Sequence, residues 1–275
     1  MDAGLSEVFN VVKSESVLLL DCCGGPGPLL SGAVAVDLAL PLEEALLRAR
    51  RESLETFGPE DPSCAVVFDG GGSPDRRDLA AVLRGPAGCR RVLCAGRGEF
   101  FARYPFLLDA DVLEASAYPS EILEGSLFLG SALAVERQER LDNLGITHVV
   151  SVIDRRVAVP ARQEHLWCRI DDDPSEDLAP VMREALPFVA DAVAGGGRVL
   201  VHCEQGRSRS ASVVIAHLMC ARGWGAQEAL RAVQRQRPAV QPNAGFMEQL
   251  RRADWESLVP RGRAARGAIP EKAST

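Results

Sequence analysis

The chain has few aromatic side chains, since phenylalanine, tryptophan and tyrosine make up 5% of its 275 residues. Its hydrophobic cores must therefore be built from alanine, leucine and valine. No apolar run reaches the length of about 18 residues that marks a membrane-spanning helix, so we expect no membrane span. The net charge of −7 argues against binding nucleic acid through the general surface of the protein.

Signals for secretion and for zinc are also missing. The first ten residues contain two acids and no basic residue, whereas secretory signals begin with a basic segment and mitochondrial presequences are rich in arginine. The eight cysteines include no Cys-x-x-Cys pair of the kind that holds zinc. We therefore expect reduced thiols in a cytoplasmic protein, with the nucleus and the mitochondrion as alternative compartments.

The most informative stretch is residues 199–210, which read VLVHCEQGRSRS. The apolar residues predict a buried strand, the glycine predicts a tight loop, and the residues that follow predict the start of a helix. In such a loop the backbone N–H groups and the positive end of the helix surround the cysteine. Both lower the pKa of a thiol and both bind an oxyanion, so the pattern indicates attack of a thiolate on a phosphate ester.

The polar side chains that flank the loop have predicted roles. Cys203 is the nucleophile, Arg209 grips two phosphate oxygens with its planar fork, and Ser210 donates its hydroxyl to the thiolate. His202, at the end of the strand, is expected to organise the loop rather than to act as a base. The residues expected to bind phosphate, mainly through backbone amides, are Glu204, Gln205, Gly206, Arg207, Ser208 and Arg209.

This stretch resembles the signature of the dual-specificity group of cysteine-based protein phosphatases, His-Cys-x-x-Gly-x-Ser-Arg-Ser. The resemblance covers about 140 residues and is carried further by residues 118–131, 144–152 and 242–250. It implies an α/β catalytic domain over residues 117–258, with Asn243 in a supporting role before the closing helix. It also implies hydrolysis of phosphotyrosine and of phosphoserine or phosphothreonine in proteins through a phosphocysteine, with no metal and no cofactor.

A general acid must protonate the oxygen that leaves the phosphate, and a loop carboxylic acid commonly does so. Residues 171–173 are three aspartates that precede a predicted helix over residues 178–194. Alignment with the resembling family selects Asp172 as the acid, with Asp171 as the alternative. Asp177 is better explained as an N-cap candidate of the helix, where an acid also favours the helix dipole.

Two loop positions depart from the commonest pattern of the family. Gln205 stands where alanine is frequent, and Arg207 stands where an apolar or aromatic residue is frequent. A larger positive field would favour a highly anionic substrate, so a phosphoinositide phosphatase is an alternative function. Neutral variation of a solvent-facing loop explains the two residues equally well.

Two other cysteines bear on the nucleophile. Cys168 lies just before the acidic segment, and Cys22 lies at the end of a predicted strand. We expect both to be packed thiols, with a reversible disulfide to Cys203 under oxidant as the alternative.

Residues 1–108 alternate between predicted strands and predicted helices, a pattern typical of a parallel sheet with flanking helices. This segment resembles the rhodanese-like domain that precedes the catalytic domain of mitogen-activated protein kinase phosphatases. Residues 18–22, 66–69 and 92–105 carry the resemblance. Asp69 stands where active rhodaneses have their cysteine, so we expect this domain to be non-catalytic.

Such domains dock kinases through a basic cluster beside apolar residues, and Arg48, Arg50 and Arg51 are the candidates in this chain. The implied partner is a phosphorylated protein, in particular a mitogen-activated protein kinase with an acidic groove. A solvated helix face with i,i+4 charge pairs explains the same residues without a partner.

The whole chain also resembles the serine/threonine/tyrosine-interacting-like proteins, which share the two-domain layout. Some of these have lost the catalytic cysteine and act as adaptors, so a phosphoprotein-binding adaptor with little catalysis is a further alternative. Residues 259–275 are rich in arginine, alanine, glycine and proline without periodicity, and they predict a disordered tail.

Overall fold

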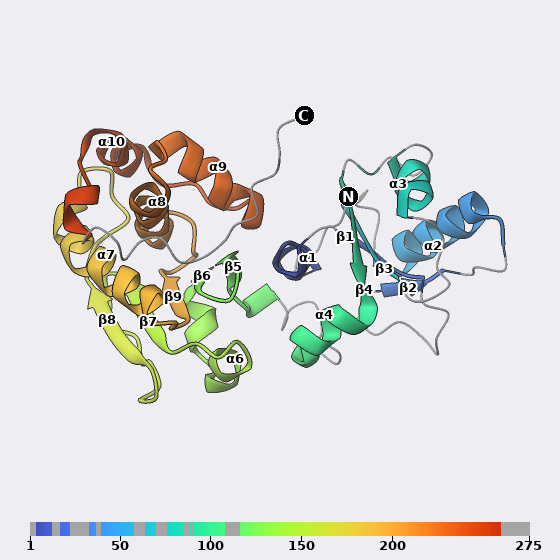
Figure 1. The fold of residues 1–275 in the computed structure, drawn as a ribbon, viewed down its shortest axis with the longest axis horizontal. Coiled ribbons are helices and arrows are strands. Elements are labelled where there is room, and N and C mark those ends of the chain that lie inside the picture. Colours follow the sequence, from blue (N-terminus) through green and yellow to red (C-terminus); the bar gives the residue numbers. More distant parts are fainter. Residues whose placement is uncertain are drawn as a thin grey trace. The chain divides into compact units, whose positions relative to one another are not determined.

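Figure 1 shows the computed structural model, which describes residues 4–12, 17–22, 33–36, 40–57, 64–69, 76–84, 89, 91–107 and 116–259. Contacts divide the chain into two units, Met1–Ser116 and Ala117–Thr275, and each unit has its own sheet. Both units are of the α/β class, as the sequence predicts. Val259, the first residue of the tail predicted over residues 259–275, is buried in the core of the second unit, so that bound was wrong by one residue. Residues 260–275 and the connection at residues 108–115 lie outside the described residues.

The first unit contains a parallel four-stranded sheet in the order β2-β1-β3-β4. Its strands are β1 (Val17–Asp21), β2 (Ala33–Ala35), β3 (Cys64–Asp69) and β4 (Arg91–Gly96). Parallel strands that are covered on both faces are apolar along their whole length, which explains the apolar runs of β1 and β3. The parallel sheet predicted from the alternating pattern is confirmed, although the sequence analysis missed β2, which is only three residues long.

Among the described residues of this unit, the helices are α1 (Leu5–Val12), α2 (Leu42–Phe57), α3 (Arg76–Arg84) and α4 (Arg97–Arg103). Leu46 of α2 and Leu83 of α3 belong to one buried cluster with Leu18 of β1. A second cluster is aromatic, because Phe9 of α1 stacks on Tyr104 with ring centroids 4.4 Å apart. Phe68 of β3 and Phe100 and Phe101 of α4 extend this aromatic cluster, with ring centroids 5.2–5.7 Å apart.

The second unit contains a five-stranded sheet in the order β5-β6-β9-β7-β8, with β5 antiparallel to β6 and the other pairs parallel. Its strands are β5 (Ser120–Leu123), β6 (Leu127–Gly130), β7 (His148–Val152), β8 (Glu164–Cys168) and β9 (Val199–His202). All four residues of β9 are buried, because this strand is the middle of the sheet. The carboxyl end of β9 therefore has a paired strand on each side, β6 and β7.

Helices α7 (Ala179–Ala194), α8 (Arg209–Arg222), α9 (Ala226–Gln236) and α10 (Ala244–Arg252) gather on one face of this sheet, and α6 (Gln138–Asn143) lies on the other (Figure 1). Every residue of α8 from Arg209 to Leu218 is buried. A helix that is buried all round lies inside a layer of helices, and α8 contacts α7, α9 and α10. The start of α8 is therefore buried, like the end of β9.

One local expectation was wrong. Helix α7 begins at Ala179 and its N-cap is Leu178, one residue after the candidate Asp177. Asp177 still accepts a hydrogen bond of 2.9 Å from the N–H of Ala179, so its carboxylate satisfies a free donor at this helix end from one position further out. Of the helices that the structure describes, none combines the length and the apolar character that crossing a membrane would require.

Candidate active site

The loop between β9 and α8 carries the predicted catalytic residues. Within it Gly206 has a φ of +68°, a conformation that other residues rarely adopt. A Cβ atom at Gly206 would lie 2.5 Å from the carbonyl oxygen of Gly130, at the end of the neighbouring strand β6. Both the turn of the loop and its close approach to β6 therefore require glycine at position 206.

Each carbonyl oxygen of the loop, residues 203–208, accepts a hydrogen bond from a group outside the ring of loop amides. In a planar trans peptide the carbonyl and the next N–H point in opposite directions, so these contacts fix the N–H groups of residues 204–209. The loop becomes a set of oriented donors for an oxyanion. In order along the loop, the donors are His202 Nδ1 (3.4 Å), Ala132 N (3.1 Å), Arg237 Nη2 (3.1 Å), Arg237 Nε (3.0 Å), Gln241 N (2.9 Å) and Ser212 N (2.9 Å).

Cys203 is 1% exposed, and its Sγ accepts hydrogen bonds from the N–H of Gly206 at 3.2 Å and from the hydroxyl of Ser210 at 3.1 Å. Burial raises the pKa of this thiol, but hydrogen bonds from the Ser210 hydroxyl and from the loop amides outweigh burial, and the pKa is lowered overall. Burial instead raises the pKa of Cys168 to about 12 and that of Cys220 to about 11. The environment thus favours the thiolate at Cys203 and disfavours it at the other two.

His202 is fully buried, and burial lowers its pKa to about 4. Its Nδ1 faces the carbonyl oxygen of Cys203, an acceptor, so Nδ1 carries the proton and Nε2 accepts from the hydroxyl of Ser151 at 2.7 Å. Ser151 in turn lies 2.8 Å from Nε2 of His165, which must then be the donor. A neutral imidazole in this chain of hydrogen bonds orients the first peptide of the loop, as expected for an organising residue.

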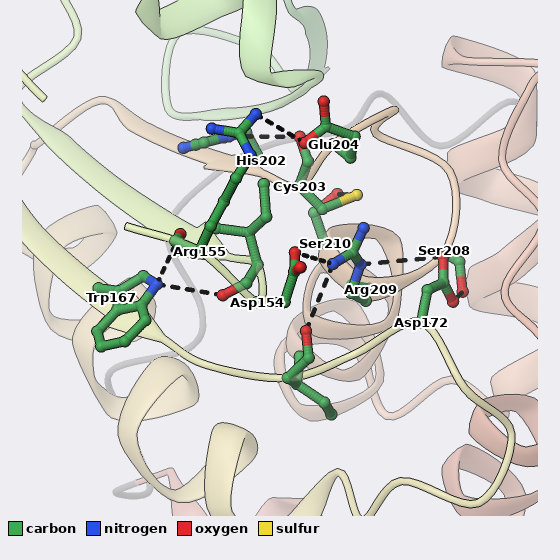
Figure 2. A network of polar contacts seen from close by, with 12 residues as sticks. Asp154, Arg155, Trp167, Asp172, His202, Cys203, Glu204, Ser208, Arg209 and Ser210 are labelled. Carbon is green, nitrogen blue, oxygen red and sulfur yellow. Dashed lines mark hydrogen bonds and ion pairs between the residues drawn. The ribbon is translucent and has the colours of Figure 1, made fainter. Parts of the chain in front are cut away.

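Arg209, the first residue of α8, is 8% exposed. Its Nη1 lies 3.2 Å from Oδ1 of Asp154 and 3.4 Å from the carbonyl oxygen of Ile170, and its Nε lies 3.9 Å from Oδ2 of Asp172 (Figure 2). The guanidinium is therefore held between two carboxylates, beside the loop that surrounds Cys203. A planar fork fixed in this way can bind two phosphate oxygens.

The three aspartates of the acidic segment have different surroundings. Oδ1 of Asp172 accepts from the hydroxyl of Ser208 at 2.6 Å and from the side-chain amide of Asn243 at 3.0 Å. Asp173 accepts from both the N–H and the hydroxyl of Ser175, and these bonds lower its pKa, which disfavours a role as an acid. Asp171 is exposed and makes no side-chain hydrogen bond to any described residue. Asp172 is the one that contacts the loop.

Helix α10 holds the acidic segment in place. Asn243 caps this helix by accepting from the N–H of Phe246 at 2.9 Å, while its amide reaches Asp172. Gln249 accepts from the N–H of Leu178 and donates to the carbonyl of Glu176, both at 2.8 Å. These contacts tie the segment to the helix at two separate points.

A close backbone approach adds to these contacts. A Cβ atom at Gly245 would lie 1.8 Å from the carbonyl oxygen of Pro174, so only glycine lets the acidic segment lie this close to α10. The position of Asp172 is thus set by both hydrogen bonds and packing.

A second group of contacts ties the segment after β7 to the site (Figure 2). The indole N–H of Trp167 lies 3.1 Å from the carbonyl of Ile153 and 3.2 Å from that of Arg155. Arg155 in turn pairs with Glu204 of the loop at 2.9 Å. Trp167 therefore fixes the segment that presents Asp154 to Arg209.

The two unusual loop residues are both exposed. Arg207 donates from Nε to the carbonyl of Ala239 at 3.1 Å and from Nη2 to the side chain of Gln241 at 3.0 Å. Its guanidinium is thus used in holding the segment before α10. Gln205 contributes its carbonyl to the loop through Arg237.

Two predicted features are not part of this loop. Arg48 and Arg51 are exposed on α2 in the first unit, and the side chain of Arg50 lies outside the described residues. Cys168 ends β8, and strand β7 lies between β8 and β9, so the Cα atoms of Cys168 and Cys203 are about two strand spacings, roughly 10 Å, apart. A disulfide needs Cα atoms within about 7 Å, so Cys168 cannot pair with Cys203 in this fold.

Sequence reasoning missed Asp154, Ser151, His165, Arg237 and Gln249. A usable signal existed for Asp154, because it closely follows a buried strand and carboxyl ends of parallel strands meet at one edge of a sheet. The others lie far from the loop in the sequence, and only the tertiary fold brings them to it.

A cysteine whose thiol pKa is lowered, placed at the carboxyl end of a central parallel strand and surrounded by amides and an arginine, is the arrangement expected of a cysteine-dependent phosphatase. The family described as dual specificity phosphatase, catalytic domain, matches residues 127–256. The putative tyrosine phosphatase 123R of Invertebrate iridescent virus 6 is 34% identical over 134 residues, which are 48% of this chain and 89% of the viral protein. The chain belongs to the dual-specificity phosphatase family.

The chain matches only part of the length of two mammalian relatives. Rat protein phosphatase Slingshot homolog 3 is 41% identical over 127 residues, which are 45% of this chain and 19% of the rat protein. Human dual specificity protein phosphatase 5 is 38% identical over 205 residues, which are 74% of this chain and 49% of the human protein. The human match is longer than the whole second unit, so it includes part of the first.

Proposed function

We propose that this protein hydrolyses phosphate esters of tyrosine and of serine or threonine in phosphorylated proteins, through a phosphocysteine at Cys203. One observation carries the proposal. The lowered pKa of the Cys203 thiol occurs inside a loop whose amides are all oriented by outward hydrogen bonds, beside the buried fork of Arg209. A nucleophile and a binding site for three phosphate oxygens therefore coincide.

In the first step the Sγ of Cys203 attacks phosphorus, and the bond between phosphorus and the leaving oxygen breaks. The loop amides and Arg209 stabilise the negative charge on the three remaining phosphate oxygens. Asp172, in its protonated form, gives its proton to the leaving oxygen, so that an alcohol or a phenol departs. The hydrogen bonds from Ser208 and Asn243 both hold Oδ1 of Asp172. The other oxygen, Oδ2, is then the one that carries the transferred proton.

In the second step a water molecule attacks the phosphocysteine. Asp172, now a carboxylate, takes a proton from the water, and the phosphorus–sulfur bond breaks to release inorganic phosphate. The hydroxyl of Ser210, at 3.1 Å from Sγ, stabilises the thiolate that leaves. In both steps Asp172 transfers the proton, and the loop amides, Arg209 and Ser210 stabilise the negative charges.

The substrate class is tested with pairs of peptides that differ only in whether the phosphate is on tyrosine or on threonine. We expect phosphate release from both. Release from the tyrosine peptide alone, with kcat/KM for the threonine peptide at background, would contradict dual specificity.

For the substrate we propose a mitogen-activated protein kinase, recruited through α2 of the first unit. Arg48, Arg51 and Leu47 line one surface hollow together with Pro41, Glu43 and Glu44. The exposed arginines offer positive charge, and the half-buried leucine offers an apolar contact, to an acidic groove. The two glutamates of the same hollow repel carboxylates, so they limit binding to grooves whose acids face the arginines.

The docking proposal is tested by capture of a purified phosphorylated kinase. Changing Arg48 and Arg51 to alanine should reduce capture, and changing Glu43 and Glu44 to glutamine is the matched control on the same helix face and should preserve or increase it. Capture that is unaffected by the arginine changes would reject this surface as the docking site.

A further inference from the structure

Arg237 is a half-buried arginine to which no catalytic role has been given above. It is the residue after α9, and Pro238 follows it. A residue before proline is pushed out of the helical region, and Arg237 accordingly has an extended backbone with φ −142° and ψ 91°. The helix therefore ends at Gln236, and the side chain of Arg237 reaches the loop that holds Cys203.

The fork of Arg237 donates to two consecutive carbonyls of this loop. Nη2 lies 3.1 Å from the oxygen of Gln205, and Nε lies 3.0 Å from the oxygen of Gly206. The carbonyl of Gln205 shares a peptide plane with the N–H of Gly206, and the carbonyl of Gly206 shares one with the N–H of Arg207. Arg237 thereby sets the direction of two successive amides.

Both amides are among the groups that favour the thiolate of Cys203. The N–H of Gly206 lies 3.2 Å from the Sγ of Cys203, and backbone hydrogen bonds of Ser210, Arg207 and Gly206 lower the pKa of this thiol. The same donors would face the oxygens of a bound phosphate. One guanidinium thus controls, from outside the loop, two of the donors inside it.

The remaining donor edge of Arg237 is also used. Its Nη1 lies 3.3 Å from the hydroxyl of the buried Ser120, so all three nitrogens contact the protein. A lysine could supply the charge but could not reproduce this planar, three-sided contact. The fork is therefore engaged with the protein rather than presented to a second anion of the substrate.

We propose that Arg237 is a positioning residue of the phosphatase site, whose fork orients the N–H of Gly206, which contacts Cys203, and the N–H of Arg207 that follows it. A role of Arg237 in catalysis rests on the proposed function. Its effect on the reactivity of the Cys203 thiol does not, and can be measured separately. Arg237 also interacts with Cys203 through its charge. Burial lowers the pKa of Arg237, whereas the negative charge of the Cys203 thiolate raises it.

The test measures the reactivity of Cys203 without requiring turnover. The full-length protein is alkylated with iodoacetamide between pH 5 and pH 10, and modification is followed by mass spectrometry of the peptide that contains Cys203. We expect Arg237→Met and Arg237→Lys to slow alkylation at pH 6 roughly three- to tenfold, with rates at pH 10 near those of the unchanged protein. Loss of thiolate, rather than loss of access, gives this difference between the two pH values.

Arg235→Met is the matched control, since Arg235 is an exposed arginine in the last turn of the same helix. It should leave alkylation unchanged at both pH values. The lysine variant keeps the positive charge, so it serves as the test if the methionine variant does not fold.

Three results would overturn the proposal. Unchanged alkylation in both Arg237 variants would show that the amides are oriented without the fork, and unchanged alkylation in Arg237→Lys alone would show that only charge matters. Equal slowing at pH 6 and pH 10 would indicate altered access. If the unchanged protein shows a reactive Cys203 that depends on Arg237 but releases no phosphate from any ester, the proposed function fails while this inference stands.

Discussion

Nη1 of Arg209 lies 3.2 Å from Oδ1 of Asp154, and this ion pair joins the start of α8 to the segment after β7. Trp167 holds that segment through two hydrogen bonds from its indole N–H. The arginine expected to bind phosphate is therefore oriented by a carboxylate 55 positions earlier in the chain. The pair also lowers the pKa of Asp154, after the larger effect of a backbone hydrogen bond, so Asp154 remains charged and attractive to Arg209.

Replacing Asp154 tests this relationship. Asp154→Ala should reduce kcat/KM for an aromatic phosphate ester about tenfold, mainly through a higher KM, because Arg209 loses the contact that fixes its fork. Asp142→Asn is a matched control, since Asp142 pairs with Arg162 on the surface. A variant with unchanged KM would show that Arg209 is positioned without Asp154.

The glycine of the loop allows a controlled comparison. Gly206 and Gly223 have nearly the same positive φ, +68° and +66°, but a Cβ atom would clash with Gly130 only at position 206 and would meet open space at position 223. Gly223→Ala should cost about 1 kcal/mol of stability and leave activity intact. Gly206→Ala should cost more and abolish phosphate release.

The free energies of unfolding of these two variants are measured by urea titration, followed by tryptophan fluorescence. All three tryptophans, Trp167, Trp224 and Trp255, lie in the second unit and report on it. Full activity of Gly206→Ala would contradict the close packing of the loop on β6.

Asn243 has two contacts that a single substitution can separate. Asn243→Asp keeps an oxygen that caps α10 but replaces the amide donor to Asp172 with a second carboxylate oxygen. Stability should change by less than about 0.5 kcal/mol, because aspartate is as good an N-cap as asparagine. The value of kcat should fall about tenfold, because the acid loses its orienting donor. A large loss of stability with unchanged kcat would show that the cap is the main contribution of Asn243.

Two buried histidines predict a sensitivity to acid. Burial lowers the pKa of His202 and of His217 from 6.5 to about 4. The unfolded chain therefore takes up protons at these histidines as the pH falls below about 6.5, whereas the folded protein does not until about 4. The contribution of these two histidines to the free energy of unfolding is fully present above pH 6.5 and is lost as the pH falls toward 4.

From pH 7.5 to pH 5, each of these histidines should contribute a loss of about 2 kcal/mol in the free energy of unfolding. His217→Leu should remove one of the two contributions while keeping the packing of α8. Urea titrations at the two pH values, followed by tryptophan fluorescence, measure the loss. Equal free energies of unfolding at both pH values would contradict neutral, buried histidines.

The sequence was most informative where function is local. A strand, a glycine turn and a helix start follow each other within twelve residues, so Cys203, Arg209 and Ser210 could be placed in one loop from the sequence. The structure brings Asp172 to the same loop, although the sequence left Asp171 open because three adjacent aspartates look alike. Their differences arise from Ser175, Ser208 and Asn243.

The supporting residues could not be found in this way. Asp154 reaches Arg209 because β7 lies beside β9, and Arg237 reaches the loop because α9 ends at Gln236, just before it. The direction of Arg207 was equally hidden, since its guanidinium is held by Ala239 and Gln241. A proline can mark where a helix ends, but which strands become neighbours and which side chains then meet is decided by the tertiary fold.

The central claim is that Cys203 and Asp172 together cleave a phosphate monoester. Its most direct test is phosphate release from an aromatic phosphate ester by the full-length protein with reduced thiols, compared with its Cys203→Ser and Asp172→Ala variants. We predict turnover that Cys203→Ser lowers by at least about a thousandfold and Asp172→Ala by about a hundredfold in kcat. Turnover that survives the loss of Cys203, or no turnover by the folded and reduced protein, would contradict this account.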